Sequence, residues 1–156
     1  MIITFYLIIL LLMCVVISIM DVKYYKIGNK ILTVLFYLQF VNMFLSSSLF
    51  LMPVLIVMVV GMMLYWFSVI AAGDIKYAAV LSLSIPMELL PSALLLTMLA
   101  GGVLASFYLL FNLARRIKAN ANGGIDDNQY NTGIPYGVAI SVGFYVMIFS
   151  HWVNYI

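Results

Sequence analysis

Charged and metal-binding side chains are scarce in this chain of 156 residues. Only 8% of the residues are charged, and the sequence contains five acidic residues, seven basic residues, one histidine and one cysteine. A single cysteine excludes intramolecular disulfides and cysteine-rich metal sites, and we interpret Cys14, which lies in an apolar run, as a packing residue. The net charge of +2, without a basic and aromatic patch, argues against nucleic acid as a partner. We expect no metal and no cofactor.

Apolar residues, by contrast, are abundant. They make up 67% of the chain, and the mean hydropathy is +1.21, which is more apolar surface than a water-soluble domain of this length can hide. The lipid bilayer is therefore the expected solvent, and we expect a single transmembrane domain over residues 1–156. No Lys or Arg precedes the first apolar run, whereas a cleavable signal peptide carries its basic residues there. We expect this run to be a retained first span.

The apolar segments predict an all-α, polytopic membrane protein with six transmembrane helices. A helix needs about 20 apolar residues to cross the hydrocarbon core, and tilt or local thinning accommodates shorter ones. On this measure the spans are 2–20, 31–48, 51–70, 75–90, 91–113 and 134–154. The fourth span is short and is interrupted by Pro86, so a count of four or five spans remains an alternative.

The basic residues predict the orientation of the spans. All seven fall in the loops after the first, third and fifth predicted spans: Lys23, Lys26 and Lys30; Lys76; and Arg115, Arg116 and Lys118. The positive-inside rule then places these loops in the cytoplasm and both termini outside, in a multi-pass protein of the cytoplasmic (inner) membrane. No other span count separates the charges so cleanly, which favours six.

Two acidic residues adjoin predicted spans on the inner side, Asp21 in "DVKY" and Asp74 in "DIKY". The first and third spans run in the same direction, so both aspartates reach the same leaflet. Either one alone could mark a helix end, and Asp74 could cap the helix that follows it. A pair of carboxylates at the membrane is costly and favours a function, in chemistry or in transport.

Neighbouring carboxylates share one proton, so such a pair supplies both a base and an acid for hydrolysis of an amide bond. The rest of the sequence offers no competing catalytic group. His151, the lone histidine, lies at the outer end of the last predicted span. A Ser-His-Asp arrangement would therefore lack its base, and a His/Cys metal site would lack its ligands. Peptide hydrolysis in this chain would require an aspartic mechanism.

Three segments resemble motifs of the type IV prepilin peptidase family. "AAGDIKYAAV", residues 71–80, resembles the Gly-x-Gly-Asp motif of intramembrane aspartic proteases, followed by the Lys typical of prepilin peptidases. "DVKYYKIGNK", residues 21–30, resembles the first aspartate motif of that branch, and "GIPYGVAISVG", residues 133–143, resembles a segment of its short Tad/Cpa-type members. Ala71 and Gly28 replace a Gly and a Pro of these motifs, and neither replacement removes a catalytic group.

The resemblance implies that Asp21 and Asp74 are catalytic and that the chain removes the leader of type IV prepilin-like (Flp/Tad pilin) substrates at the cytoplasmic membrane face. It further implies supporting roles for motif residues and a substrate groove beside the last span: Gly73, Lys76, Lys23 and Asn29, and Pro135, Tyr136 and Gly137. The implied partners are a prepilin or pseudopilin in the membrane and the pilus assembly or secretion machinery. Because the chain has no Cys-x-x-Cys insertion, we expect no methyltransferase activity.

Two other functional classes remain open. A small proton- or ion-coupled transporter could use the two acids as carriers, although the outer halves of the first and third spans are almost wholly apolar. The other class is a non-catalytic membrane scaffold. Residues 115–133 predict a basic start followed by a mobile loop, and the pairs Gly137/Ser141 and Ala139/Gly143, each four residues apart, predict close helix packing.

Overall fold

The computed structural model describes residues 2–25, 27–46, 50–121 and 135–153, and over these residues it contains helices and no strands. The helices are α1 (Ile2–Tyr24), α2 (Asn29–Ser46), α3 (Leu51–Trp66), α4 (Ala72–Ser82), α5 (Leu90–Ala121) and α6 (Tyr136–Val153). The predicted all-α class is confirmed.

Three of the described helices, α1, α5 and α6, are long and apolar enough to cross a membrane by length and composition. Helix α3 is also apolar but has only 16 residues, and α4 has 11. These helices support the prediction that the chain is a membrane protein. The count of six spans and the orientation of the termini stay predictions.

The fourth and fifth helices differ from the predicted spans. Helix α4 begins at Ala72 and ends at Ser82, instead of covering 75–90, because turns that include Pro86 follow it. Asp74 therefore lies inside the first turn of a helix and not in a break between two helices. Helix α5 continues to Ala121, into the segment predicted as a loop, where its sequence is rich in helix-forming residues. Residues 122–133 of that predicted loop lie outside the described residues.

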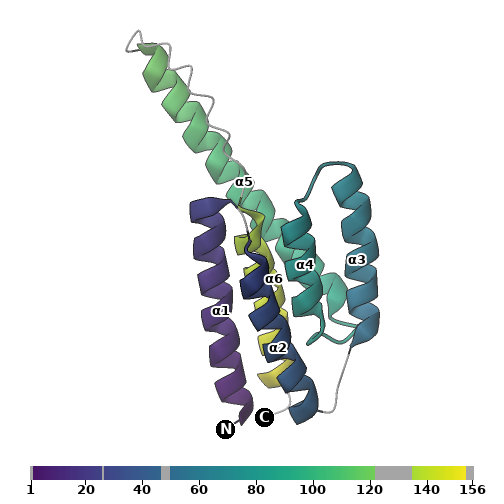
Figure 1. The fold of residues 1–156 in the computed structure, drawn as a ribbon. Helices are drawn as coiled ribbons and strands as arrows, with labels where there is room; N and C mark the ends of the chain where they lie inside the picture. The colour runs from purple at the N-terminus through teal and green to yellow at the C-terminus, as the bar shows by residue number, and fades with distance from the viewer. Residues whose placement is uncertain (1, 26, 47–49, 122–134, 154–156) are drawn as a thin grey trace.

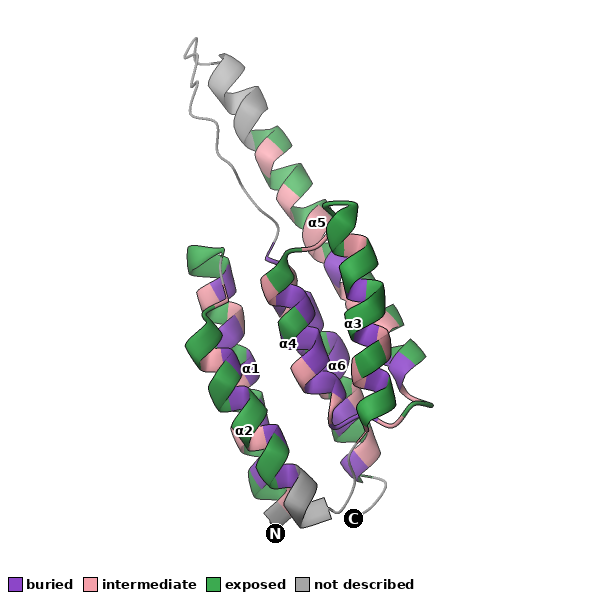
Figure 2. Cartoon of the chain, turned by 45° about the vertical axis from the view of Figure 1, so that its right-hand side comes forward, coloured by how far each residue is buried: buried purple, intermediate pink, exposed green. Residues whose placement is uncertain are grey.

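Helix α6 occupies the centre of the arrangement. It packs against α1, α4 and α5, while α2 contacts α1 and α4, and α3 packs on α4. Helix α1 begins and α6 ends at the same end of the bundle, and the last part of α5 projects beyond the opposite end (Figure 1). Buried residues concentrate on α4 and on the inner faces of the other helices, whereas outward faces of α1, α3 and α5 are exposed (Figure 2). Many of the exposed side chains there are large and apolar, which suits contact with lipid.

The core consists of the inward side chains of these helices. Its largest fully buried members include Leu10 and Ile17 of α1, Tyr77 of α4 and Phe144 of α6. Cys14 is also buried and belongs to the same cluster, which agrees with its interpretation as a packing residue.

Two helices end in left-handed residues at the same end of the bundle. The φ angles of Tyr25 and Ser68 are 50° and 56°. The Tyr25 N–H donates to the carbonyl of Asp21 at 2.8 Å, and the Ser68 N–H donates to the carbonyl of Tyr65 at 2.8 Å. These bonds terminate α1 and α3 with the cap geometries that usually use glycine at this position. They fix the positions at which the chain leaves both helices, next to the cavity described below.

The contact between α5 and α6 depends on the absence of a side chain at Gly143. A Cβ atom there would lie 2.7 Å from the backbone N of Thr97 and 2.9 Å from the backbone O of Ala93, and it would also overlap the Thr97 hydroxyl. Backbone atoms cannot rotate away, so the two helices would have to separate. The pair Ala139/Gly143 thus has the close-packing role that its four-residue spacing predicts.

Gly143→Ala is therefore expected to destabilise the fold by about 1–3 kcal/mol, the usual cost of overpacking. Thermal unfolding of the purified protein in detergent measures the effect. Gly102→Ala on α5 is the matched control, because nothing lies within 4 Å of its added Cβ and alanine favours a helix over glycine by about 1 kcal/mol. Equal melting temperatures for Gly143→Ala and the unchanged protein would contradict this packing.

Candidate active site

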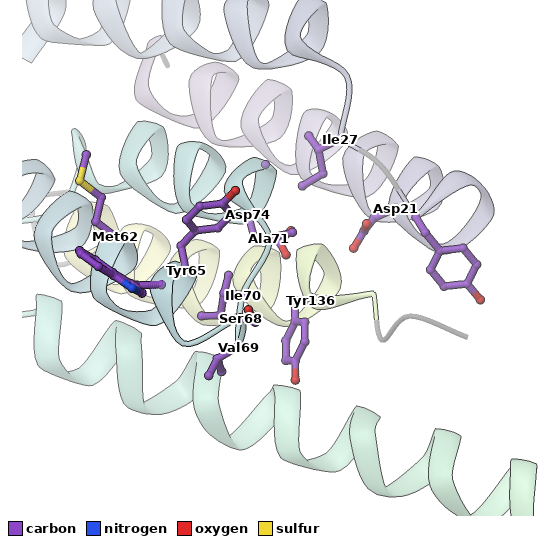
Figure 3. A pocket seen from close by; sticks show the side chains of 13 residues that line it. Asp21, Ile27, Met62, Tyr65, Ser68, Val69, Ile70, Ala71, Asp74 and Tyr136 are labelled. Carbon is purple, nitrogen blue, oxygen red and sulfur yellow. The ribbon is translucent and has the colours of Figure 1, made fainter. Parts of the chain in front are cut away.

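Asp21 and Asp74 lie at the same end of the bundle. Asp21 is in the last turn of α1 and Asp74 is in the first turn of α4, and they are only 5% and 6% exposed. Both side chains line one cavity of about 1090 Å³ (Figure 3). The helices that carry them are joined through α6, which packs against both. The two acids, 53 positions apart in the printed sequence, thus share one site.

The cavity has an acidic side and an apolar, aromatic side. The carboxylates of Asp21 and Asp74 mark the first side. The end of α3 and the segment after it form the second, with Met62, Tyr65, Trp66, Val69 and Ile70. Its remaining lining residues are Tyr25, Ile27, Ser68, Ala71, Gly73 and Tyr136. A ligand that fills this space would contact carboxylate oxygens and apolar surface at once.

The Asp21 carboxylate is held by the start of α6. The backbone N–H of Gly137 donates to Asp21 Oδ2 at 2.7 Å. Amides in the first turn of a helix have no partner within the helix, and the helix dipole favours a negative charge there. The approach is this close only because Gly137 lacks a side chain, since an added Cβ would lie 2.7 Å from Asp21 Oδ2.

The Asp74 carboxylate caps the helix that carries it. Ala71, the residue before α4, has an extended backbone with φ −76° and ψ 148°, and its backbone hydrogen bonds to the Asp74 carboxylate. This arrangement matches the acidic residue of a capping box. Asp74 therefore both caps α4 and lines the cavity. Gly73 has room around it, because the nearest atom to an added Cβ is Ile27 Cβ at 3.7 Å.

Burial and proximity both act on the charges of this pair. Withdrawal from water disfavours the ionised form of a carboxylic acid, and a second carboxylate nearby disfavours it further. Hydrogen bonds from backbone N–H groups favour the ionised form. Two carboxyl groups that interact strongly share protons as a unit, and a state with one proton between them supplies an acid and a base together.

Several motif residues surround the site without lining the cavity. Lys23 and Lys76 are exposed, and Lys23 Nζ lies 5.4 Å from the centre of the Tyr24 ring. In the described part of the chain no ion pair joins either lysine to Asp21 or Asp74. Asn29 begins α2 and is exposed. Their predicted supporting roles remain predictions.

The segment predicted as a wall of the substrate groove, Pro135 to Gly137, lies at the site itself. Tyr136 lines the cavity, Pro135 is fully buried, and Gly137 contacts Asp21 directly. His151 lies in the last turn of α6, roughly 20 Å further along that helix, by the rise per residue. Within the described ranges no three His, Cys, Asp or Glu side chains cluster in a way that could hold a metal ion.

A set of hydroxyl groups beneath the acids was not predicted. Tyr77, Ser141 and Ser18 come from α4, α6 and α1 and are hydrogen bonded to one another through Ser141. Helical periodicity offered a signal, because Tyr77 lies three residues after Asp74 and Ser18 three residues before Asp21. Residues at this spacing share a helix face.

Fold and site together define an α-helical, membrane-embedded protein with two buried carboxylates on one cavity. The model of the type IV leader peptidase family matches residues 8–106, which include both aspartates, most of α1 and all of α2, α3 and α4. The chain belongs to the type IV leader peptidase family. It has no significant match among curated proteins or solved structures. Gly137 and the rest of α6 lie outside the matched residues, so their place in the site comes from the structure.

Proposed function

We propose that the protein is an aspartic endopeptidase that removes the leader of type IV prepilin-like substrates, of the Flp/Tad pilin kind, at the cytoplasmic face of the cell membrane. The observation that carries the proposal is the pair of buried carboxylates, Asp21 and Asp74, on one cavity. Membership of the leader peptidase family supports peptide hydrolysis. The carboxylate pair supports an aspartic mechanism.

In this mechanism a water molecule between Asp21 and Asp74 is the nucleophile. One ionised carboxylate takes a proton from the water while its oxygen attacks the carbonyl carbon of the scissile bond, and the other carboxyl group gives its proton to the carbonyl oxygen. Collapse of the tetrahedral intermediate breaks the C–N bond, the amine product receives the proton first taken from water, and one hydroxyl of the intermediate returns its proton to the other carboxylate as the C=O bond re-forms. The product acid and amine leave, and the pair again holds one proton.

The acidic and apolar walls of the cavity suit a peptide substrate that is polar on one side of the scissile bond and apolar on the other. A prepilin-like substrate carries a short leader before its hydrophobic segment, so its scissile bond lies where the chain enters the membrane. The acids lie at one end of the bundle, next to the exposed Lys23, Lys30 and Lys76, which favours the cytoplasmic interface by the positive-inside rule. The apolar wall that includes Met62 and Trp66 suits the start of a hydrophobic segment.

Co-expression with candidate prepilins is expected to shorten one of them. The mass of its mature N-terminus identifies the bond that is cut, and purified membranes show whether another component is needed. A transporter or a scaffold would leave every prepilin at its full length, in contrast to a peptidase. Failure to process any candidate, with the protein inserted and folded, would contradict the proposal.

A further inference from the structure

One serine hydroxyl joins three helices a turn beneath the two acids. Ser141 Oγ of α6 donates to the Gly137 carbonyl at 2.7 Å, with a longer contact of 3.4 Å to the Cys14 carbonyl. The Ser18 hydroxyl of α1 donates to Ser141 Oγ at 2.9 Å, and the Tyr77 hydroxyl of α4 lies 2.8 Å from it. We call this arrangement the Ser141 junction.

The junction uses the whole hydrogen-bonding capacity of Ser141. A serine hydroxyl has one hydrogen to donate and two lone pairs to accept with. The hydrogen goes to the Gly137 carbonyl and Ser18 donates to one lone pair, while the Tyr77 hydroxyl, which also hydrogen bonds to the Cys14 side chain, lies at the other. Tyr77 and Ser141 are 0% and 6% exposed. Removal of Ser141 Oγ would therefore leave the buried Tyr77 hydroxyl with its bond to the Cys14 side chain, a weaker partner than a hydroxyl oxygen, which is costly in an apolar interior.

Each arm of the junction lies one helical turn from a residue of the site. Tyr77 follows Asp74 by three residues, and Ser18 precedes Asp21 by three residues. Ser141 follows, by four residues, the glycine whose N–H binds Asp21. Residues three or four apart lie on the same face of a helix. The junction and the site are therefore two successive layers of the same three-helix contact.

The separation of the two acids depends on α6, because any direct contact between α1 and α4 is weak and α6 packs on both of them more extensively than α2 does. We propose that Ser141 is a positioning residue that sets the distance and mutual orientation of the Asp21 and Asp74 carboxylates. The role rests on the proposed peptidase function, since it acts through those two groups. It assigns Ser141 and Tyr77 to the working site, although neither lines the cavity.

The test compares Ser141→Ala and Tyr77→Phe in purified, monodisperse enzyme acting on a prepilin that contains its leader and first hydrophobic segment. Each variant is expected to lower kcat about 10-fold or more and to keep KM within twofold, because the cavity that binds substrate is unchanged. The double variant is expected to lose less than the product of the two single losses, since both changes remove the bond between Tyr77 and Ser141. Unchanged kcat in either single variant, a rise in KM alone, or multiplied losses in the double variant would overturn the role.

Ser106→Ala is the matched control. Ser106 on α5 donates to the Gly102 carbonyl at 2.8 Å, four residues earlier, as Ser141 does to Gly137, but Ser106 lies on an exposed face. The control removes the bond within the helix and leaves the Ser141 junction intact, so kcat is expected to match that of the unchanged enzyme. A loss equal to that of Ser141→Ala would assign the effect to helix stability and overturn the role.

Hydrogen–deuterium exchange tests the positioning role without an activity assay, because it measures how well the backbone amides at the start of α6 are protected. The Gly137 amide binds Asp21 in the first turn of α6, so Ser141→Ala is expected to increase exchange in the peptide at the start of α6, whereas Ser106→Ala leaves it unchanged. Exchange that does not respond would overturn the positioning role. If exchange responds but the unchanged enzyme cuts no prepilin, the proposed function fails and the structural junction stands. If the enzyme cuts prepilin and both variants keep their kcat, the junction proposal fails alone.

Discussion

Replacement of Asp21 or Asp74 by asparagine is expected to reduce leader removal by about 10³-fold or more, in the upper part of the range for loss of general acid–base catalysis. Asparagine has nearly the shape of aspartate, and its amide oxygen can still accept the hydrogen bond that Gly137 donates to Asp21. The geometry of the site is therefore largely kept while its proton chemistry is lost. Cleavage of a co-expressed or purified prepilin, measured by the mass of the mature product, gives the rate.

The double variant sharpens this prediction. Because the two carboxyl groups act as one unit, Asp21→Asn together with Asp74→Asn is expected to be about as slow as either single change, since their losses are not additive. Glu88→Gln is the matched control, because Glu88 is an exposed acid in the turns between α4 and α5 and the chemical change is the same. Normal processing by either single asparagine variant, in protein that inserts and folds, would remove that residue from the mechanism.

The elements that the sequence predicts well are those set by local composition. Apolar runs of sufficient length are helices, so four of the predicted spans correspond closely to α1, α2, α3 and α6, and the fifth corresponds to α5 at its start but ends eight residues before Ala121. The fourth span was predicted poorly at both ends: position 75 lies three residues after the start of α4, because Gly73 and Asp74 have the composition of a break, and position 90 lies eight residues beyond its end at Ser82. In the structure Ala71 is the residue before the helix, and Asp74 stabilises its first turn through the Ala71 backbone.

Contacts between distant segments could not be predicted from the sequence. The first and third predicted spans run in the same direction, which predicts that Asp21 and Asp74 lie in the same leaflet. That prediction gives no sign that α6 packs against both of the helices that carry them. The bond from Gly137 to Asp21 joins residues 116 positions apart, and it requires α6 to approach α1 closely at one point. Ser141 likewise has the spacing of an ordinary packing residue, and only the arrangement of three helices shows that it is a hydrogen-bonded junction.

Gly137→Ala is expected to lower the turnover of folded enzyme by about 10²-fold, the loss associated with a misplacement of roughly 1 Å in a catalytic group. The added methyl group would lie 2.7 Å from Asp21 Oδ2, 3.1 Å from its Cγ and 3.2 Å from its Cβ. Either the carboxylate or the start of α6 must then move, and the bond from the Gly137 N–H to Asp21 is lost or lengthened. Steady-state cleavage of prepilin by monodisperse protein measures the loss.

Two other glycines separate this effect from general damage to the helices. Gly102→Ala meets no atom within 4 Å, whereas Gly143→Ala overlaps backbone atoms of α5 at a point about 9 Å along α6 from Gly137, by the rise per residue. Gly102→Ala should keep both stability and turnover, and Gly143→Ala should lose stability more than turnover per folded molecule. Gly137→Ala should show the reverse pattern, with turnover lost more than stability. The methyl group is the one group that Gly137→Ala adds beside the Asp21 carboxylate. If the turnover of Gly137→Ala matched that of Gly102→Ala, the start of α6 would therefore not position Asp21 for catalysis.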